Sequence, residues 1–131
     1  SYVADQVLKL MIKKRINVVD ANILIMGMTF KENCPDIRNT RVVDLVREFS
    51  GFNCNVDVYD PWVDKEHCKH EYSIKPIDEP QKRKYDAIVL AVSHDEFKAL
   101  SEEEIRGYGK DCHVLYDIKY LLKANESDGR L

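Results

Sequence analysis

The hydrophobic pattern changes its period between residues 22 and 49, and this change most constrains the fold. Residues 22–26 form a short run rich in large aliphatic side chains, which Asp20 precedes and Gly27 follows. Such a run favours a buried central strand, although a piece of buried helix has the same pattern. Farther along, apolar residues recur with the spacing of one helix face, at Val42, Leu45, Val46 and Phe49. A strand, a polar loop and a helix in this order open a nucleotide-binding α/β unit.

The predicted helix has polar residues at its start and a glycine at its end. Asn39 or Thr40 is placed to cap its first turn, and Gly51 to end it. The loop before the helix contains Lys31 and Arg38, so cationic side chains precede the positive end of a helix dipole. Bound phosphate is expected in such a place. Two solvated loop cations are the alternative interpretation.

Further segments extend the alternation of strands and helices. Residues 1–14 have an apolar stripe typical of a helix. Strands are expected at residues 55–59, 72–77, 85–92 and 113–117, and short helices near residues 62–69 and 95–100 and after Ser101. Pro76 restricts the strand at 72–77 to an edge of the sheet. We therefore predict an N-terminal helix and a Rossmann-like three-layer α/β/α fold, whose five parallel strands, numbered along the chain, lie in the order 3-2-1-4-5.

Size, charge and cysteine spacing exclude several classes of protein. The chain has 131 residues, which is the length of one domain, and its net charge of -3 provides no basic field for nucleic acid. No apolar run reaches the roughly 20 residues that cross a membrane. The four cysteines contain no C-x-x-C pair, so neither a zinc cluster nor a dithiol redox motif is indicated. We expect no metal site, and reduced thiols in a cytoplasmic protein.

Ligands of parallel α/β sheets bind beyond the carboxyl ends of the strands. The residues expected there are Phe30, Lys31, Asp60, Ser93, His94 and Lys119. The first loop has Gly27 followed by bulky Met28 and lacks G-x-G-x-x-G, so close approach of a dinucleotide pyrophosphate is not expected. Asp60 is either a ribose-binding acid or part of an Asp–Pro turn, and His94 is either an acid–base group or a structural histidine.

A phosphoacceptor receiver domain is an alternative with the same topology. Such a domain has an Asp and a Ser or Thr at strand ends and a Lys after the last strand, which Asp60, Ser93 and Lys119 would provide. Two features oppose this interpretation. Gly27 and Met28 occupy the place of the acidic pair that would hold Mg²⁺, and Asp60 follows the second strand rather than the third.

Three motifs resemble those of one enzyme family. Residues 27–40, GMTFKENCPDIRNT, fit the signature G-x-x-F-K-x-x-x-x-D-x-R-x-S/T. Residues 58–61, VYDP, and 91–97, AVSHDEF, are similar to a Y-D-P strand end and an A-x-x-H-x-x-F segment. Over essentially its whole length the sequence resembles the C-terminal domain of the UDP-glucose/GDP-mannose dehydrogenase family. Residues 31–40 are most similar to the bacterial branch that oxidises UDP-N-acetylhexosamines for surface polysaccharides.

The resemblance implies a division of labour within a larger enzyme that oxidises the C6 alcohol of a UDP-sugar to a carboxylate. An N-terminal Rossmann domain would bind NAD, and a central helical region would supply a cysteine nucleophile and the contacts of a homodimer. Residues 1–18 would end that helical region. Residues 19–131 would form the UDP-sugar-binding C-terminal domain, which has no catalytic residue and is inactive without the rest of the polypeptide. Neither nucleic acid nor a membrane is implied as a partner.

Position by position, the resemblance assigns roles to single residues. Phe30 and Lys31 match the Phe-Lys that binds the nucleotide sugar, and Arg38 matches an arginine that reaches the NAD phosphates. The family has Asp-x-Arg after the last strand, with the arginine on the substrate, whereas this chain has Asp117 and Lys119. Lysine keeps the charge of that contact and loses the bidentate fork of arginine. A non-catalytic α/β nucleotide-binding or regulatory module is the alternative function.

Overall fold

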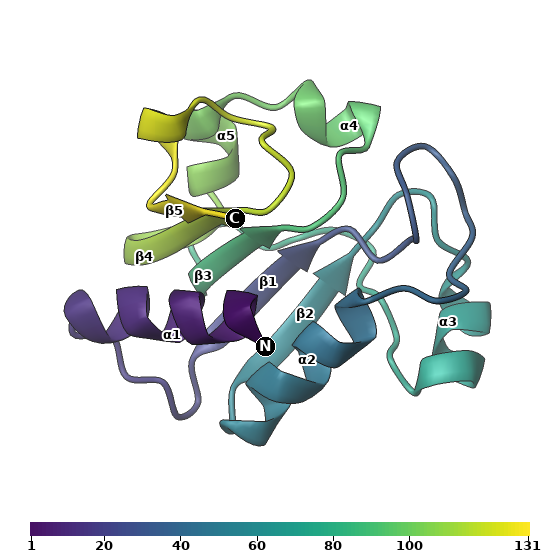
Figure 1. Ribbon diagram of the computed structural model, residues 1–131, viewed down its shortest axis with the longest axis horizontal. Helices are drawn as coiled ribbons and strands as arrows, with labels where there is room; N and C mark the ends of the chain where they lie inside the picture. Colours follow the sequence, from purple (N-terminus) through teal and green to yellow (C-terminus); the bar gives the residue numbers. More distant parts are fainter.

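The computed structural model describes residues 1–131 and contains one parallel β-sheet between helices (Figure 1). The sheet has the order β2-β1-β3-β4-β5. Its strands are β1 Asn22–Met26, β2 Asn55–Tyr59, β3 Tyr85–Leu90, β4 Gly109–Asp117 and β5 Gly129–Arg130. The helices are α1 Tyr2–Lys13, α2 Val42–Gly51, α3 Lys65–Tyr72, α4 Asp95–Lys98 and α5 Glu102–Arg106, with a 3₁₀ turn, η1, at Ala124–Glu126.

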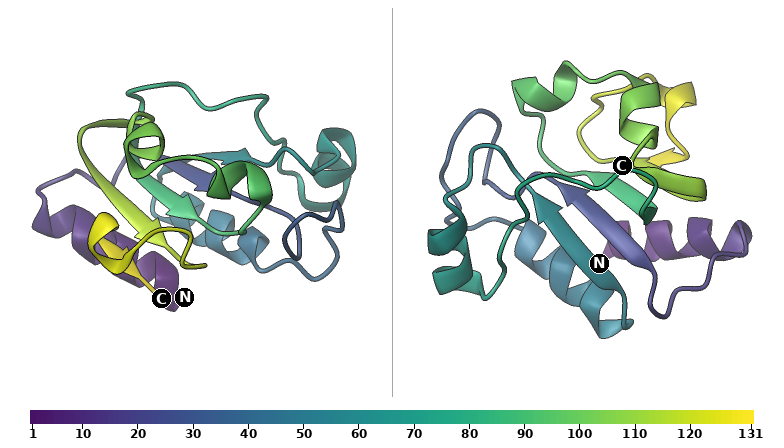
Figure 2. Two further views of the ribbon diagram at one scale, coloured as in Figure 1. Left: turned by 90° about the horizontal axis from the view of Figure 1, so that it is seen from above. Right: turned by 180° about the vertical axis from the view of Figure 1, so that it is seen from behind.

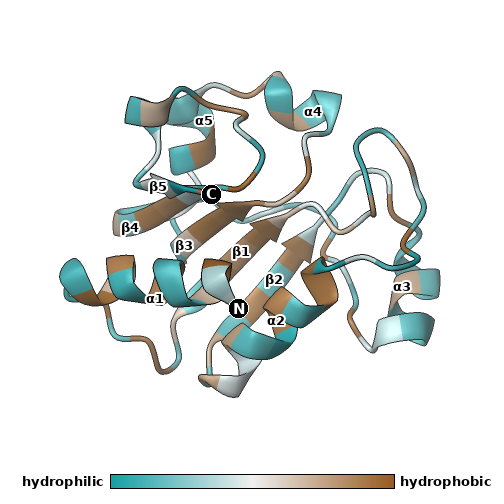
Figure 3. Cartoon of the chain, in the orientation of Figure 1, coloured by the Kyte–Doolittle hydropathy of each residue, from teal (hydrophilic) through white to brown (hydrophobic).

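The central strands β1 and β3 are the most apolar segments of the sheet because helices cover both of their faces. All of β3 is buried, as is all of β1 after Asn22. In Figure 3 these strands are largely brown, whereas teal residues lie on the outer sides of the helices. Met26 pairs with Tyr59 on one side and with Leu90 on the other. The three strands therefore end level with one another, which brings the loops that follow them together.

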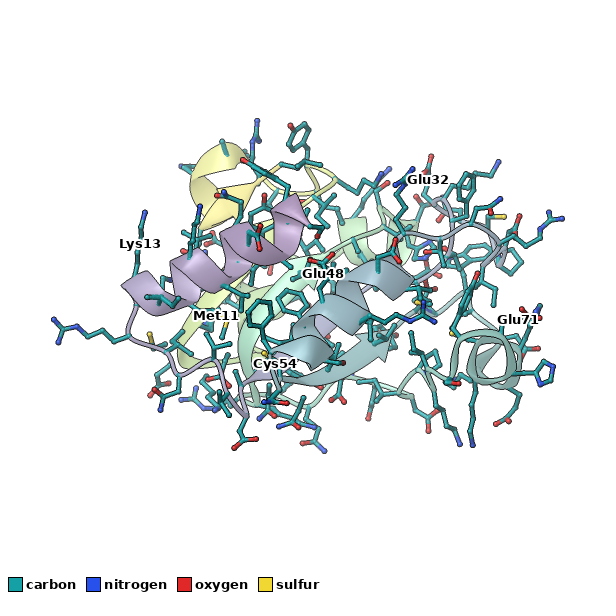
Figure 4. The ribbon with its side chains drawn as sticks, turned by 60° about the horizontal axis from the view of Figure 1, so that its bottom comes forward. Met11, Lys13, Glu32, Glu48, Cys54 and Glu71 are labelled. Atoms are coloured by element: carbon teal, nitrogen blue, oxygen red, sulfur yellow. The ribbon has the colours of Figure 1, made fainter.

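Helices α1 and α2 cover one face of the sheet, and α4 and α5 cover the other. From behind (Figure 2, right), α1 and α2 lie on the far side of the strands. Met11 of α1 is fully buried in the core on that face, while Lys13 projects into solvent (Figure 4). The opposite face packs on Phe97 of α4 and Ile105 of α5. The predicted three-layer fold with an N-terminal helix is confirmed.

Four of the five predicted strands are present, and their neighbours are as predicted. The strand predicted at residues 72–77 was wrong: α3 continues to Tyr72, Ser73 takes a left-handed conformation that ends this helix, and Pro76 has no N–H to donate. Only the N–H of Ile77 bonds to β2, at the carbonyl of Val58 (2.8 Å). The fifth strand is β5, which pairs with β4 at the opposite edge.

Helix α2 begins later than the sequence suggested. Arg41 is its first flanking residue and makes no side-chain cap. Thr40 acts one position earlier, where its Oγ1 accepts a hydrogen bond from the N–H of Val42 (3.2 Å). Asn39, the other predicted cap, has a positive φ of 59° and turns the chain into the helix. The first turn of α2 therefore begins immediately after a sharp bend.

All four cysteines are free thiols. His, Cys, Asp and Glu side chains form no cluster of three or more that could hold a metal ion. None of the helices is long and apolar enough to span a membrane.

Candidate functional site

The carboxyl ends of β1 and β3 lie in direct contact. Gly27 has a φ of +111°, and a Cβ at this position would lie 2.6 Å from Cβ of Val92 and 2.7 Å from its backbone nitrogen. The N–H of Ala91 donates to the carbonyl of Met26 (2.9 Å), and the N–H of Gly27 donates to that of Tyr59 (2.8 Å). A residue with a side chain does not fit at Gly27, because both the space and the backbone conformation exclude it.

A pocket of about 550 Å³ opens beside this junction, on the face of the sheet that α1 and α2 cover. Its walls come from the ends of β1, β3 and β4, the start of α2 and both chain termini. The lining includes Phe30 and Lys119, together with Thr40 just before α2 and Asp44 in its first turn. Because N–H groups at a helix start carry partial positive charge, this wall suits an anion, although the Asp44 carboxylate opposes one.

Phe30 and Lys31 lie on the exposed loop that follows β1. The N–H of Phe30 donates to the carbonyl of Asp36 (2.7 Å), which closes the loop on itself. The hydroxyl of Thr29 donates to the carbonyl of Lys31 (3.0 Å). Phe30 is 56% exposed, and Lys31 is exposed and forms no salt bridge. An aromatic face and an unpaired ammonium group are therefore available to a ligand.

Arg38 lies farther along the same loop and is held by Asp36. Its Nε and Nη2 each donate to one carboxylate oxygen of Asp36, both at 3.0 Å. The hydrogen bond to the Arg38 side chain, with a further one from the Arg38 N–H, lowers the pKa of Asp36 to about 2. The Arg38 side chain is 84% exposed and lies outside the pocket lining. Its guanidinium is therefore oriented but accessible.

Asp60, at the end of β2, is a buried anchor for the first loop. Its Oδ2 accepts hydrogen bonds from the N–H groups of Met28 (2.6 Å) and Thr29 (3.0 Å), and its Oδ1 accepts one from Trp62 (2.7 Å). Burial alone would raise the pKa of Asp60, but these donors and His94 outweigh burial and lower it. Asp60 is only 3% exposed. Its carboxylate therefore stabilises this turn and is not available to bind a ribose.

His94 lies in the same buried network. Its Nε2 is 2.9 Å from Oδ2 of Asp60 and 3.2 Å from Oγ1 of Thr29, and its Nδ1 accepts a hydrogen bond from the N–H of Asn33 (2.9 Å). The carbonyl oxygen of the Asn33 side chain accepts one from the N–H of Asp95 (3.0 Å). The imidazole is fully buried. It therefore lacks access to a ligand for acid–base chemistry.

Asp117, at the end of β4, holds the loop that carries Lys119. Its Oδ1 accepts hydrogen bonds from the N–H groups of Lys119 and Leu121, both at 3.2 Å, and its Oδ2 accepts one from Leu122 (2.9 Å). Asp117 is fully buried, whereas Lys119 is exposed at the pocket wall. The aspartate of the predicted motif thus shapes the loop and leaves the cation free.

The first loop does not fit a dinucleotide of the NAD type. In dinucleotide-binding sheets, glycines let the backbone of this turn approach the pyrophosphate. Here Gly27 packs directly against Val92, which leaves no space for a ligand beside it. The next two residues, Met28 and Thr29, are buried, and their N–H groups donate to Asp60. No backbone N–H of this turn remains for a pyrophosphate.

A family model supplies the deciding comparison. The model described as "UDP-glucose/GDP-mannose dehydrogenase family, UDP binding domain" matches residues 24–124. The chain belongs to this family. The matched residues run from β1 to η1 and include the sheet up to β4, Asp60, His94 and the pocket walls formed by strand ends.

Curated relatives of this UDP-binding domain are dehydrogenases. UDP-N-acetyl-D-glucosamine 6-dehydrogenase of Salmonella typhi and the protein of the same name from Pseudomonas aeruginosa are each 56% identical to the chain over all its 131 residues. Protein CapL of Staphylococcus aureus is 34% identical over 95% of the chain. The chain spans 31% of the length of the first two relatives and 29% of the third.

Solved structures share the fold. The structure of UDP-D-ManNAc dehydrogenase from Pyrococcus horikoshii matches 98% of this chain and 29% of its own, with a TM-score of 0.77 and 24% identity. A UDP-glucose dehydrogenase from Pyrobaculum islandicum matches with a TM-score of 0.71 and 20% identity, over 98% of this chain and 29% of its own. At these identities, the likeness bears on the fold alone.

The UDP-binding domain brings some of the predicted site residues together and leaves others apart. Phe30 and Lys119 line the same pocket, whereas Lys31 and Arg38 lie on the adjoining loop and outside its lining. Their roles toward substrate and cofactor stay predictions. Sequence reasoning missed Asn33, whose backbone and side chain both bond across the site. A signal was present, because asparagine tolerates the left-handed conformation, with a φ of 54°, that Asn33 adopts.

Proposed function

We propose that this chain is the UDP-sugar-binding domain of an NAD-dependent dehydrogenase that oxidises the C6 alcohol of a UDP-N-acetylhexosamine to a carboxylate. The observation that carries this proposal is the 56% identity, over the whole chain, to two UDP-N-acetyl-D-glucosamine 6-dehydrogenases. A non-catalytic regulatory module is not favoured, because the curated relatives that cover the chain at this identity are enzymes. Cytoplasmic location follows from the use of nucleotide sugars and NAD.

Three residues are proposed to hold the substrate. Lys31 provides an unpaired ammonium for the diphosphate, and the exposed ring of Phe30 provides a face on which a base can stack. Lys119 adds a second cation at the pocket wall. The pocket has the volume of a ligand cleft, about 550 Å³. Together the two lysines complement the negative charge of the diphosphate of UDP, and the ring of Phe30 complements its aromatic base.

The oxidation itself is assigned to the rest of a longer polypeptide. NAD bound there would supply the hydride acceptor for oxidation of the sugar carbon, and a cysteine of a central helical region would supply the nucleophile. Residues 1–18 are proposed to end that region and residues 19–131 to form the substrate domain of a homodimeric enzyme. We expect the isolated chain to be inactive. Arg38, oriented by Asp36 but exposed, is proposed to reach the cofactor phosphates across the cleft.

Kinetics of the full-length dehydrogenase test the role of Lys31. Because a hydrogen bond to a charged group contributes about 1.5–3 kcal/mol, Lys31→Ala should raise KM for the UDP-sugar by roughly 10- to 150-fold. Lys82→Ala is the matched control, since Lys82 is exposed in the segment before β3 and lies outside the pocket lining. An unchanged KM in Lys31→Ala would remove this residue from the site. A panel of UDP-sugars, with NADH formation as the readout, would identify the preferred hexosamine.

The same assay separates substrate binding from cofactor binding. Arg38→Ala should raise KM for NAD and leave KM for the UDP-sugar close to that of the wild type, because the guanidinium lies outside the pocket lining. Arg38→Lys keeps the charge and loses the bidentate fork, so it should recover part of the NAD affinity. A change confined to the UDP-sugar would contradict the assignment of Arg38 to the cofactor.

A further inference from the structure

We propose that His94 is a positioning residue for the substrate-binding loop. As an uncharged imidazole with its proton on Nε2, it joins Asp60 to Asn33 and thereby sets the main-chain path of residues 28–33, which carry Phe30 and Lys31. The effect on ligand binding rests on the proposed function of these two residues. The hydrogen-bonding state of His94 does not rest on it, and it can be measured separately.

The partners of the two ring nitrogens determine which one carries the proton. A backbone N–H can only donate, so Nδ1 of His94 must present a lone pair to the N–H of Asn33 (2.9 Å). A neutral imidazole then has its proton on Nε2. This nitrogen faces Oδ2 of Asp60 (2.9 Å) and Oγ1 of Thr29 (3.2 Å), and the Thr29 hydroxyl already donates to the carbonyl of Lys31. The Nε2–H tautomer therefore satisfies every partner, whereas a doubly protonated ring would set two donors against each other at Asn33.

Packing prevents the ring from turning to other partners. Trp62 stacks on the imidazole with ring centres 6.1 Å apart, and Phe97 of α4 meets its edge at 5.4 Å. Asp60 is the charged side chain that pairs with the ring. Glu96, an acidic residue at the start of α4, pairs with Trp62 instead: its carboxylate accepts a hydrogen bond from Nε1 of Trp62 (2.9 Å). The imidazole is thus locked between one carboxylate and one backbone N–H.

The network holds the loop at both ends. Asp60 binds the N–H groups of Met28 and Thr29 at the start, and His94 binds the N–H of Asn33 at the end. Between these anchors lie Phe30, Lys31 and Glu32, all with exposed side chains. Loss of the second anchor would leave this end of the segment held only by the side chain of Asn33, whose carbonyl oxygen accepts a hydrogen bond from the N–H of Asp95 (3.0 Å). His94 therefore acts on the ligand through main-chain geometry, without touching it.

Two substitutions separate the two hydrogen bonds of His94. The amide of His94→Gln can reach the place of Nε2 and donate to Asp60, but it leaves Asn33 without an acceptor. The shorter His94→Asn can place its Oδ1 near the position of Nδ1 and accept from Asn33, but it loses the donor to Asp60. Ser50→Ala is the control, because Ser50 is an exposed residue near the end of α2 and its side chain forms no hydrogen bond.

The first measurement uses the unaltered 131-residue chain. Imidazole ¹⁵N chemical shifts near neutral pH should show Nε2 protonated and Nδ1 unprotonated at His94. A proton on Nδ1 would overturn the proposal. Amide hydrogen exchange of Asn33 should then be faster in His94→Gln by about tenfold or more, which corresponds to about 1.4 kcal/mol of lost protection. His94→Asn and Ser50→Ala should keep the slow exchange of the wild type.

The second measurement uses the full-length dehydrogenase. His94→Gln should raise KM for the UDP-sugar by about tenfold with little change in kcat, and His94→Asn should recover part of this loss. If His94→Gln leaves KM at the wild-type value while Lys31→Ala raises it, His94 has no positioning role. If Lys31→Ala also leaves KM unchanged, the proposed function of the loop fails. The ¹⁵N shifts and Asn33 exchange still decide whether His94 holds the loop, and the shifts require no variant that must fold.

Discussion

At the scale of single residues, Gly27 shows how one missing side chain shapes the ligand-binding edge. We expect Gly27→Ala to lower the free energy of unfolding by roughly 2–6 kcal/mol, because a positive φ and an overpacked contact each cost about 1–3 kcal/mol. The contact in question is with Val92, 2.6 Å from the added Cβ. Urea denaturation followed by circular dichroism measures the change.

Gly51 provides the matched control at the end of α2. A Cβ added there meets no atom within 4 Å, and the residue is helical. Gly51→Ala should therefore raise the free energy of unfolding by about 0.5–1 kcal/mol. Equal losses in both variants would mean that the contact with Val92 does not constrain Gly27.

Asp36 and Arg38 form a pair whose effect is measurable by titration. The pKa of Asp36, about 2, should rise toward the ordinary value of about 3.9 in Arg38→Gln, because the two hydrogen bonds to the guanidinium are then lost. Lys31→Ala should raise it far less, since Lys31 acts only through its charge at longer range. Carboxyl ¹³C shifts followed against pH give both values. If the pKa of Asp36 were the same in Arg38→Gln as in the wild type, the Asp36–Arg38 pair would not form in solution.

At the scale of elements, the short helix α5 depends on its first residues. Ser101 accepts a hydrogen bond from the N–H of Glu104 (3.1 Å), and the Glu104 carboxylate accepts one from the N–H of Ser101 (3.0 Å). Ser101→Ala should reduce the free energy of unfolding by about 0.5–2 kcal/mol. The exposed helical residue Ser50 has no such role, and Ser50→Ala should change it by less than about 0.5 kcal/mol. Thermal unfolding of both variants tests the difference.

The segment that ends in β5 is held by Asp128, which makes its attachment sensitive to acid. Burial would raise the pKa of Asp128, but the N–H of Leu115, the ammonium of Lys14 and the charge of Arg106 lower it below the ordinary value. A carboxylate with a depressed folded pKa contributes stability above its unfolded pKa of about 3.9, and this contribution is lost as the pH falls through the folded pKa.

We therefore expect the free energy of unfolding to fall as the pH drops below about 4, and to fall less steeply in Asp128→Asn. The slope should not vanish in the variant, because Asp60 and Glu104 also have lowered pKa values. Urea midpoints measured at a series of pH values provide the comparison. Identical slopes for both proteins would exclude a contribution from Asp128.

At the scale of the whole molecule, the strongly apolar segments were predictable and the marginal ones were not. Residues 22–26 and 85–90 are buried on both faces, so their short apolar runs favour central strands over other elements. The strand at one edge of the sheet, β5, has no such apolar run in its sequence. β5 has two residues that pair with Tyr116 and Asp117, and its position depends on Asp128 and Arg106 holding the tail in place. Contacts between distant residues decide such a strand, and local pattern does not reveal them.

The same contrast applies to the site. The predicted strand at residues 22–26 placed Phe30 and Lys31 at the carboxyl edge of the sheet, where the structure has them. Burial of Asp60 and His94 could not be derived, because a ribose-binding acid and an anchored turn have the same sequence. The pairing of His94 with Asn33 joins residues 61 positions apart. It became visible only once the fold had brought the loops together.

The contact between Gly27 and Val92 also bears on how such a domain can evolve. A site built from backbone amides depends on one main-chain conformation, so its preference for a ligand cannot change unless the turn itself is rebuilt. Here the turn is closed, so under the proposed function recognition at this edge would fall to side chains of a surface loop, which mutation can exchange one at a time. A change of sugar nucleotide would then need only single substitutions, while the sheet beneath stays as it is.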